Sequence, residues 1–294
     1  MRLFRKHRKA WKILGIVFLL LLLVNSVMLY WSNCTLKCSY YSIYSDKLTQ
    51  SVRILQLTDL HNQKFGSHNR KLVEKVKEQK PDLILLTGDL VNAGEANTEI
   101  ATELIASLKE VAPVYVSFGN HEVEQQKNYG TDLRSLYEEA GAVVLEKDYQ
   151  DISLNGEELR LGGIYGYCLP SKYLASNEAD PEECAFLEEF QNTDRYKILM
   201  CHMPVCWMIN GSLDEWDVDS IFAGHVHGGQ VVLPRLGGVY GPDLGWFPGR
   251  LYGPFYSGDG KSTMILSTGL GSNGWIPRWN NRPEIAITDL MPNE

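Results

Sequence analysis

The sequence predicts an α/β domain with two β-sheets, preceded by one N-terminal transmembrane helix. Short apolar runs alternate with amphipathic helical segments in the first half of the chain, the pattern of parallel strands joined by crossover helices. Beyond residue 150, a hairpin signal and further β-rich runs indicate more sheet. An apolar run near the N-terminus has the length of a membrane span. The 294 residues fit one large domain and its tether.

The composition excludes several classes of protein. Hydrophobic residues make up 44% and charged residues 22%, which excludes disorder, collagen and coiled coil. A net charge of −8 disfavours a general nucleic-acid-binding protein, so no nucleic-acid partner is expected. The charge is also unevenly distributed, because residues 1–31 hold six of the 28 Lys and Arg and no acid. The rest holds 22 basic and 36 acidic residues, a net −14.

The N-terminal residues are predicted to target the chain to a membrane, with a cytoplasmic basic segment at 1–12 and a transmembrane signal-anchor at 13–31. A helix needs about 20 residues to cross the hydrocarbon core, and Tyr30 and Trp31 suit its interface. A cleaved signal peptide is the alternative, although no small-x-small cleavage site follows. The positive-inside rule leaves the N-terminus in the cytoplasm and the rest outside the cell membrane. A stalk is expected at 32–50 and the main domain at 51–294.

Within the main domain, five strands are predicted from apolar runs that end abruptly in polar clusters, as in strands buried on both faces. These runs are residues 52–57, 83–86, 114–118, 198–200 and 221–223. Helices are predicted at 69–80, 97–111, 129–140 and 181–190. The Asn155-Gly156 turn predicts a hairpin of 152–154 with 159–164. Later strands are expected at 230–233, 264–267 and 285–289, and no linker divides this part.

The polar clusters that follow the strands contain five of the seven histidines. Ligands bind at the carboxyl ends of strands in open α/β sheets, and imidazole with carboxylate suits Mn, Fe or Zn. One such histidine is most simply a hydrogen-bonded residue, whereas five with two Asp and an Asn predict a metal centre. Asp-x-His and His-x-His are expected to lie on extended backbone, and Gly88, Gly119 and Gly224 to let the chain turn sharply. The candidates are Asp59, His61, Asp89, Asn120, His121, His202, His225 and His227.

In order, these clusters resemble the signature of the calcineurin-like metallophosphoesterases, from about residue 52 to residue 290. Phe65-Gly66, Gly228-Gly229-Gln230 and residues 282–285 are similar to its membrane-associated or exported phosphodiesterase branch. The resemblance implies a four-layer fold in which two mixed sheets pack as a sandwich between helices. It implies phosphodiester or pyrophosphate hydrolysis by a hydroxide that bridges two divalent ions. A broad phosphomonoesterase and a catalytically weak, metal-stabilised envelope binding protein are the alternatives.

The resemblance also implies a role for each candidate. One ion would be held by Asp59, His61, Asp89 and His227. The other would be held by Asp89, Asn120, His202 and His225, with Asp89 bridging. His121 is not expected to bind metal and resembles the histidine that stabilises the transition state or protonates the leaving oxygen. A phospholipid or an envelope-polymer intermediate would fit a tethered enzyme of this kind.

Two further features leave alternatives open. Cys34 with Cys38, Cys168 with Cys184, and Cys201 with Cys206 are possible disulfides, and Cys201 is expected to be packed or bridged rather than a metal ligand. The aromatic, glycine-rich stretch 240–256 is either a packed surface loop or a substrate wall that touches lipid headgroups. The same alternatives apply to Trp275 and Arg278.

Overall fold

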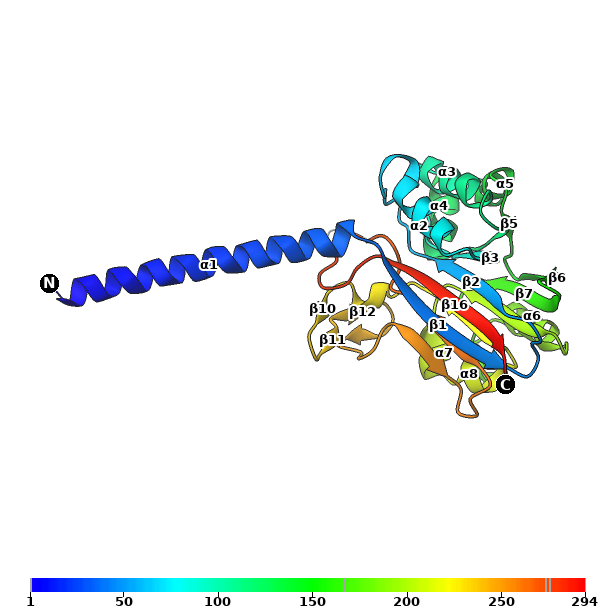
Figure 1. Cartoon of the computed structure of the whole chain (residues 1–294). Coiled ribbons are helices and arrows are strands. Elements are labelled where there is room, and N and C mark those ends of the chain that lie inside the picture. The colour runs from blue at the N-terminus through cyan, green and yellow to red at the C-terminus, as the bar shows by residue number, and fades with distance from the viewer. Residues whose placement is uncertain (1, 167, 273, 275, 294) are drawn as a thin grey trace.

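The computed structural model describes residues 2–166, 168–272, 274 and 276–293, so Trp275 lies outside the described residues. A long helix, α1 (Arg2–Cys34), leads into a domain of four layers, helices on sheet on sheet on helices (Figure 1). Within α1, Trp11–Cys34 is long and apolar enough to cross a membrane, and its residues 11–27 are exposed. The two-sheet α/β architecture predicted from the sequence is confirmed.

The first sheet has the strand order β1-β16-β2-β3-β4-β5. Strands β2 to β5 are parallel, β16 is antiparallel to β2, and β1 is parallel to β16. The bounds are β1 (Lys37–Ser45), β2 (Val52–Leu57), β3 (Leu83–Thr87), β4 (Val114–Ser117), β5 (Val143–Val144) and β16 (Glu284–Pro292). Helices α2 (Arg70–Glu78), α3 (Glu99–Leu108) and α5 (Leu133–Glu139) cover its outer face through one apolar core.

The second sheet has the order β14-β15-β9-β8-β7-β6. Its strands are β6 (Asp148–Leu154), β7 (Glu157–Ile164), β8 (Tyr196–Cys201), β9 (Ser220–Ala223), β14 (Gly253–Tyr256) and β15 (Thr263–Leu266). Helices α6 (Pro181–Gln191), α7 (Val205–Ile209) and α8 (Ser212–Glu215) cover its outer face. The inner faces of the two sheets meet in a third core, in which Ile54 and Leu85 of the first sheet share a cluster with Ile198 and Phe222 of the second.

Short elements complete the chain. They are η1 (Ser67–Asn69), α4 (Asn120–Tyr129), η2 (Ser171–Ser176), η3 (His227–Gly229), β10 (Val232–Leu233), β11 (Gly237–Gly238), β12 (Tyr240–Gly241) and β13 (Gly245–Trp246). The helix ends follow their local sequence. The Asp180 side chain accepts the Glu182 backbone N–H and Pro181 occupies the first turn of α6, whereas Gly130 ends α4 with a left-handed φ of 66°.

Two expectations differ from the structure, and a third point that the sequence left open is decided by it. The expected stalk at 32–50 contains β1, which pairs along its whole length with β16 and is therefore part of the sheet. The helix expected at 129–140 is α5 alone, and α4 precedes it directly after β4. Of the alternatives left open for the cysteines, the structure has all six free and Cys201 packed in a core, with its Sγ 3.5 Å from that of Cys168.

Candidate metal centre

The residues predicted from the sequence converge at the carboxyl ends of β2, β3, β4, β8 and β9, where the two sheets meet. Their ligand atoms form three sets, each with all atoms within 4.8 Å of one another. The sets are Asp59, His61, His227; His61, Asp89, His121; and Asp89, His202, His225. Asn120 is the first residue of α4. It lies beside these groups, since the residues before and after it, Gly119 and His121, both approach the Asp89 carboxylate. All eight candidates therefore share one site.

The backbone reaches this site through left-handed turns. Asp59, His61 and Asp89 have φ values of 53°, 47° and 54°, and His225 and His227 have 69° and 48°. The extended backbone expected for Asp-x-His and His-x-His is therefore wrong. A non-glycine residue in this region costs about 1–3 kcal/mol, and such residues persist only where the surrounding structure holds them. The strain lies at the residues that would bind metal.

The glycines beside these residues have two different functions. Gly88 has a φ of 86° and supplies the expected sharp turn. Gly119 is instead extended, with φ −108° and ψ −175°, and a Cβ there would collide with the Asp89 carboxylate. Gly224 is needed for the same reason, since its Cβ would lie 2.6 Å from Asp59 Oδ2. Lack of a side chain, rather than a turn, explains the last two.

Three histidines are oriented by hydrogen bonds at the ring nitrogen that faces away from the centre. His61 Nδ1 lies 3.1 Å from Asn92 Oδ1, and His202 Nδ1 lies 2.8 Å from the Thr87 carbonyl. His225 Nε2 lies 3.3 Å from Asp243 Oδ2. All three partners are acceptors, so those ring nitrogens carry a proton and the opposite ones are left to face the centre. This is how metal-binding histidines are held in proteins.

Two buried polar atoms of the site have no hydrogen-bond partner in the described part of the chain. They are Asn120 Oδ1 and His202 Nε2, and the latter lies 3.1 Å from Asp89 Oδ2 without the geometry of a hydrogen bond. Buried polar atoms are rarely left unpaired, and an ion is one recognised explanation. An imidazole, an amide oxygen and a carboxylate that converge on one point suit a divalent transition metal. The residues present therefore fit the expected ions.

The electrostatics place negative charge at the centre and keep most of its histidines neutral. Burial alone would raise the pKa of Asp89, but the charge of His202 lowers it well below its usual range. Burial opposes protonation of His202, yet the Asp89 charge raises the pKa of His202 to about 10. A divalent cation would neutralise the same carboxylate in place of that proton. Burial lowers the pKa of His61 to about 3 and that of His225 to about 4, so both rings are neutral at pH 7.

His121 is placed differently from the other histidines. Its Nδ1 accepts the Ala93 backbone N–H at 3.0 Å, so a neutral ring carries its proton on Nε2. That nitrogen faces the centre, 4.0 Å from Asp89 Oδ2, and the ring meets His61 edge-on with centroids 4.5 Å apart. Its backbone N–H donates to Asp89 Oδ1 at 2.8 Å. In that tautomer Nε2 presents a proton to the centre, as the role in proton transfer expected of His121 requires.

Glu122 is a supporting residue to which the sequence analysis gave no role. Its fully buried carboxylate accepts backbone N–H groups from Asp89, Leu90 and Gly119 at 2.7, 2.7 and 2.8 Å. It thereby ties the turn after β3 to the start of α4. Burial, and then the charge of Asp89, raise the pKa of Glu122 to about 7. The sequence did offer one indication of this role. Glu122 stands three residues after Gly119, the position at which a glutamate caps the N-terminus of a helix.

Arg278 also contacts the centre, in a part of the chain for which the sequence left alternatives open. Its guanidinium is buried and donates to the Gly271 and Thr268 carbonyls at 2.8 and 2.7 Å. Nη2 lies 3.4 Å from His227 Nδ1. Burial lowers the pKa of His227 well below its usual value, and the charges of His61 and Arg278 lower it further. Arg278 therefore helps to keep this ring neutral.

Two carboxylates, an amide and five imidazoles at the edge between two sheets of a four-layer α/β/β/α fold define a metal-dependent hydrolase of the dinuclear class. The sequence model for calcineurin-like phosphoesterases matches residues 52–229, and the chain belongs to that family. The family is dimetal-dependent, and its members hydrolyse phosphoric esters. The resemblance noted in the sequence is thus confirmed at the level of the family.

The chain is also similar to individual proteins. The metallophosphoesterase YkoQ of Bacillus subtilis is 26% identical over 82% of this chain and 84% of its own. Phosphodiesterase YaeI of Escherichia coli is 28% identical over 81% of this chain and 82% of its own. A solved 5′-nucleotidase precursor from Thermus thermophilus is 12% identical, with a TM-score of 0.47 over 75% of this chain and 49% of that one.

Proposed function

We propose that this enzyme is a dinuclear phosphodiesterase, acting on phosphodiester or pyrophosphate bonds and tethered to the outer face of the cytoplasmic membrane by α1. One observation carries the chemical part of the proposal: the eight predicted residues converge on one site, and Asn120 Oδ1 and His202 Nε2 are left there without partners. The diester preference is supported by the similarity to a relative named phosphodiesterase. Proposed ligands are Asp59, His61, Asp89 and His227 for one ion, and Asp89, Asn120, His202 and His225 for the other.

Two divalent ions in such a site supply an activated water and neutralise charge on the phosphoryl oxygens. The chain contributes the geometry. Asp89 joins the two halves of the site, since its carboxylate lies near His61 on one side and His202 on the other, at 3.7 and 3.1 Å. Glu122 fixes the backbone of Asp89, so this carboxylate cannot move without breaking buried hydrogen bonds.

His121 is proposed as the general acid. Its Nε2 proton points into the site, and the Ala93 N–H holds the ring in that tautomer. In the transition state this proton would pass to the oxygen of the departing alcohol, as the phosphorus–oxygen bond to that alcohol breaks. The chain thus separates metal binding from proton transfer by orienting its histidines differently.

The chemical proposal is tested with the full chain in lipid nanodiscs, loaded in turn with Mn²⁺, Fe²⁺ and Zn²⁺. Bis-p-nitrophenyl phosphate tests diester hydrolysis and p-nitrophenyl phosphate tests monoester hydrolysis. We expect the diester to have the higher kcat/KM. A higher value for the monoester would favour the broad phosphomonoesterase, and turnover of neither would contradict the enzyme proposal for simple esters.

The tether is a separate proposal, supported by the composition of Trp11–Cys34 and by the six cations within residues 1–12. An uncleaved signal-anchor predicts that the protein from cell membranes keeps residues 1–12, which intact-mass spectrometry detects. External protease should then remove the main domain from sealed cells. A mature protein that begins after residue 31 would show instead that the segment is a cleaved signal peptide.

A further inference from the structure

We propose that the substrate of this site is a phospholipid drawn from the bilayer, with its hydrocarbon portion in an apolar cavity beside His227. The inference rests on the proposed function and names a substrate class for the same site. It is carried by three observations: the cavity, the way α1 is fixed to the domain, and the exposed apolar side chains between them.

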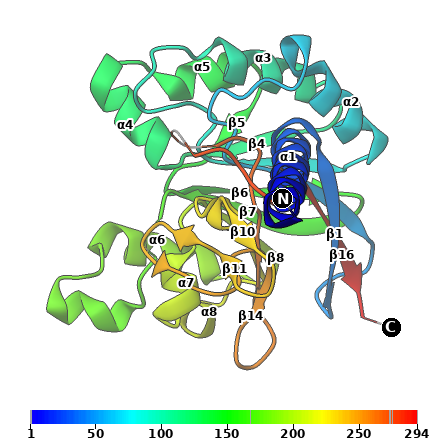
Figure 2. The ribbon, with the colours of Figure 1, turned by 90° about the vertical axis from the view of Figure 1, so that its left-hand side faces the viewer.

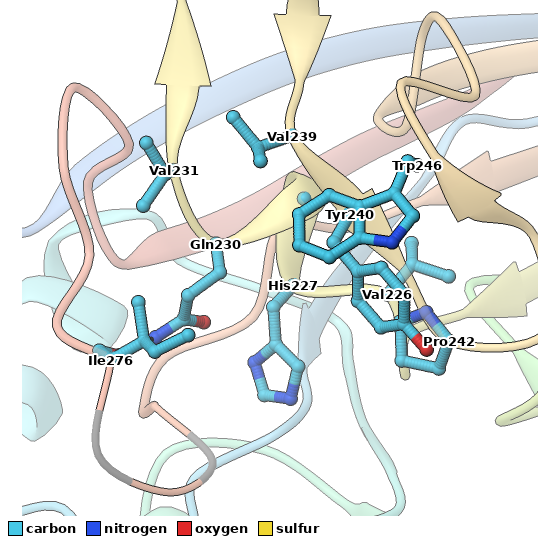
Figure 3. Close-up of a pocket in the computed structure, with 10 residues that line it drawn as sticks. Val226, His227, Gln230, Val231, Val239, Tyr240, Pro242, Trp246 and Ile276 are labelled. Carbon is cyan, nitrogen blue, oxygen red and sulfur yellow. Dashed lines mark hydrogen bonds between the residues drawn. The ribbon is translucent and has the colours of Figure 1, made fainter.

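The cavity has a volume of about 400 Å³ and opens onto the surface formed by β10 to β13. His227 lies at one end of it, with Tyr240 and Trp246 on one side and Gln230 and Ile276 on the other (Figure 3). Most of the other lining side chains are aliphatic, those of Val226, Val231, Val239 and Pro242. A cavity of this kind gives a phosphate nothing to bind, but it accommodates part of a hydrocarbon chain whose phosphate reaches the metal centre.

The α1 helix is fixed to the domain next to this cavity. Trp279 Nε1 donates to Asn25 Oδ1 at 3.0 Å, and the Arg278 N–H donates to Asn33 Oδ1 at the same distance. Asn33 Nδ2 donates in return to the Arg278 carbonyl at 2.8 Å. The orientation of the domain relative to the helix is therefore set by paired contacts near the end of α1. Where the helix crosses a membrane, the same face of the domain always meets that membrane.

That face contains the cavity. Val231, in the cavity wall, forms a bridge with Trp279, and the Val232 N–H donates to the Trp279 carbonyl at 3.0 Å. Asn25 precedes Trp31 by six residues, so the Trp279 contact lies about 9 Å below the expected interface aromatic. The wall of the cavity is thus near the level of the outer leaflet. In the view along α1, β10 and β11 lie beside the base of the helix (Figure 2).

Several exposed side chains of the cavity wall and of the neighbouring turns are apolar. Trp246 is 71% exposed, Leu236 62%, Ile276 60% and Phe247 53%. Exposed apolar side chains grouped in this way mark an interaction surface, and aromatic rings favour the level of the lipid headgroups. Because α1 holds the group against the bilayer, lipid is the partner that this surface meets.

The side of the metal centre next to His121 is polar. A groove of about 450 Å³ beside His121 is lined by Asn92, Glu95 and Ser272, among others. An amphiphile fits this division, with its hydrocarbon toward β10 to β13, its phosphate at the ions and its headgroup toward His121. A small water-soluble diester would fill the polar half only.

The test compares substrates that differ only in their acyl chains. Full-length, metal-loaded protein is supplied with dioleoyl phosphatidylglycerol or dioleoyl phosphatidylethanolamine in nanodiscs, and with the deacylated glycerophosphodiester of each. We expect kcat/KM to be higher for the acylated form of at least one pair, by about tenfold or more, since each well-fitted methylene contributes to binding. In parallel, a phospholipid with a diazirine at its acyl terminus should crosslink within residues 231–246, as mapped by mass spectrometry.

Val239→Trp, which fills the cavity, should lower the ratio of lipid to bis-p-nitrophenyl phosphate turnover by about tenfold or more. Tyr44→Ala is the matched control, because Tyr44 is also an exposed aromatic residue (58%) but lies near the far end of β1. It should leave the ratio unchanged. Hydrolysis of bis-p-nitrophenyl phosphate without acyl preference, or crosslinks spread over the domain, would overturn the lipid inference and leave the proposed function standing. Absence of turnover of every ester would contradict the proposed function itself.

Discussion

Replacement of His121 by alanine tests the proposed division between metal binding and proton transfer. His121 contacts the site in two ways, through its backbone N–H and through its ring, and a substitution can remove the second while keeping the first. Its backbone N–H supports Asp89 at 2.8 Å and is retained in alanine, whereas the ring with its Nε2 proton is lost. General acid catalysis contributes about 10²–10⁴-fold, or about 3–5 kcal/mol of transition-state stabilisation. Loss of the ring also removes the Ala93 hydrogen bond, at a cost of about 1 kcal/mol of stability.

The decisive measurement is the dependence on the leaving group. A p-nitrophenolate departs without a proton, whereas an alkoxide needs one, so His121→Ala should lower kcat strongly for an alkyl diester and only slightly for bis-p-nitrophenyl phosphate. Metal content by mass spectrometry should stay at the parental value. His68→Ala is a suitable control, because His68 is an exposed histidine that pairs with Glu103 and belongs to none of the candidate metal-binding groups. Equal losses with both leaving groups, or a loss of metal, would refute the proposed acid role.

Three further predictions concern the ions, the backbone and pH. Asp89→Asn should lower the metal content below two ions per chain and reduce turnover by about 100-fold or more, because it removes the only carboxylate proposed to bind both ions. Metal analysis and steady-state kinetics measure the two effects. Full metal occupancy in the variant would argue against a bridging role for Asp89. Gly119→Ala should likewise weaken metal binding, because its Cβ would displace the Asp89 carboxylate, whereas Gly130→Ala, with open space around its Cβ, should retain both ions. Burial raises the pKa of Glu183 to about 8 from an ordinary 4.5, so the folded chain binds more protons between these values and its stability falls as pH rises through that window. Glu183→Gln should therefore reduce the fall in Tm between about pH 5 and about pH 8, and an unchanged pH profile would contradict this assignment.

The strands and the site residues were predicted well from the sequence because the same feature, an apolar run that ends in polar residues, indicates both. Each buried strand is a short apolar run, and each ends in polar residues that a core strand would not tolerate. The positions of Asp59, Asp89 and His202 follow directly, since the carboxyl ends of neighbouring parallel strands meet at one edge. Periodicity also indicated α2, α3 and α6, although with different ends.

The sequence failed where a tertiary contact decides the structure. The polar residues of β1 predicted a stalk, yet this edge strand gains its hydrogen bonds from β16, almost 250 residues later in the chain. Helix α4 has little apolar periodicity and begins within the metal-binding motif, so its polar start resembled a loop. The contact of Cys168 with Cys201 and that of Asn25 with Trp279 join residues far apart in the chain, so no local sequence pattern indicated them.

The residues of the site have a strained, left-handed backbone, so the surrounding cores and buried hydrogen bonds have to hold them in place. Five strained residues at about 1–3 kcal/mol each are a large fraction of the 5–15 kcal/mol that stabilises a domain. The turns that carry them are extensions of β2, β3 and β9, whose apolar side chains are buried in the cores on the faces of the sheets. Buried hydrogen bonds from Glu122 then fix the turn that contains Asp89, and Asp59 in turn accepts the His225 backbone N–H at 3.0 Å. A mutation in the shared core between the sheets should therefore impair metal affinity before it unfolds the domain, because the strained turns are the first segments to relax when their support weakens.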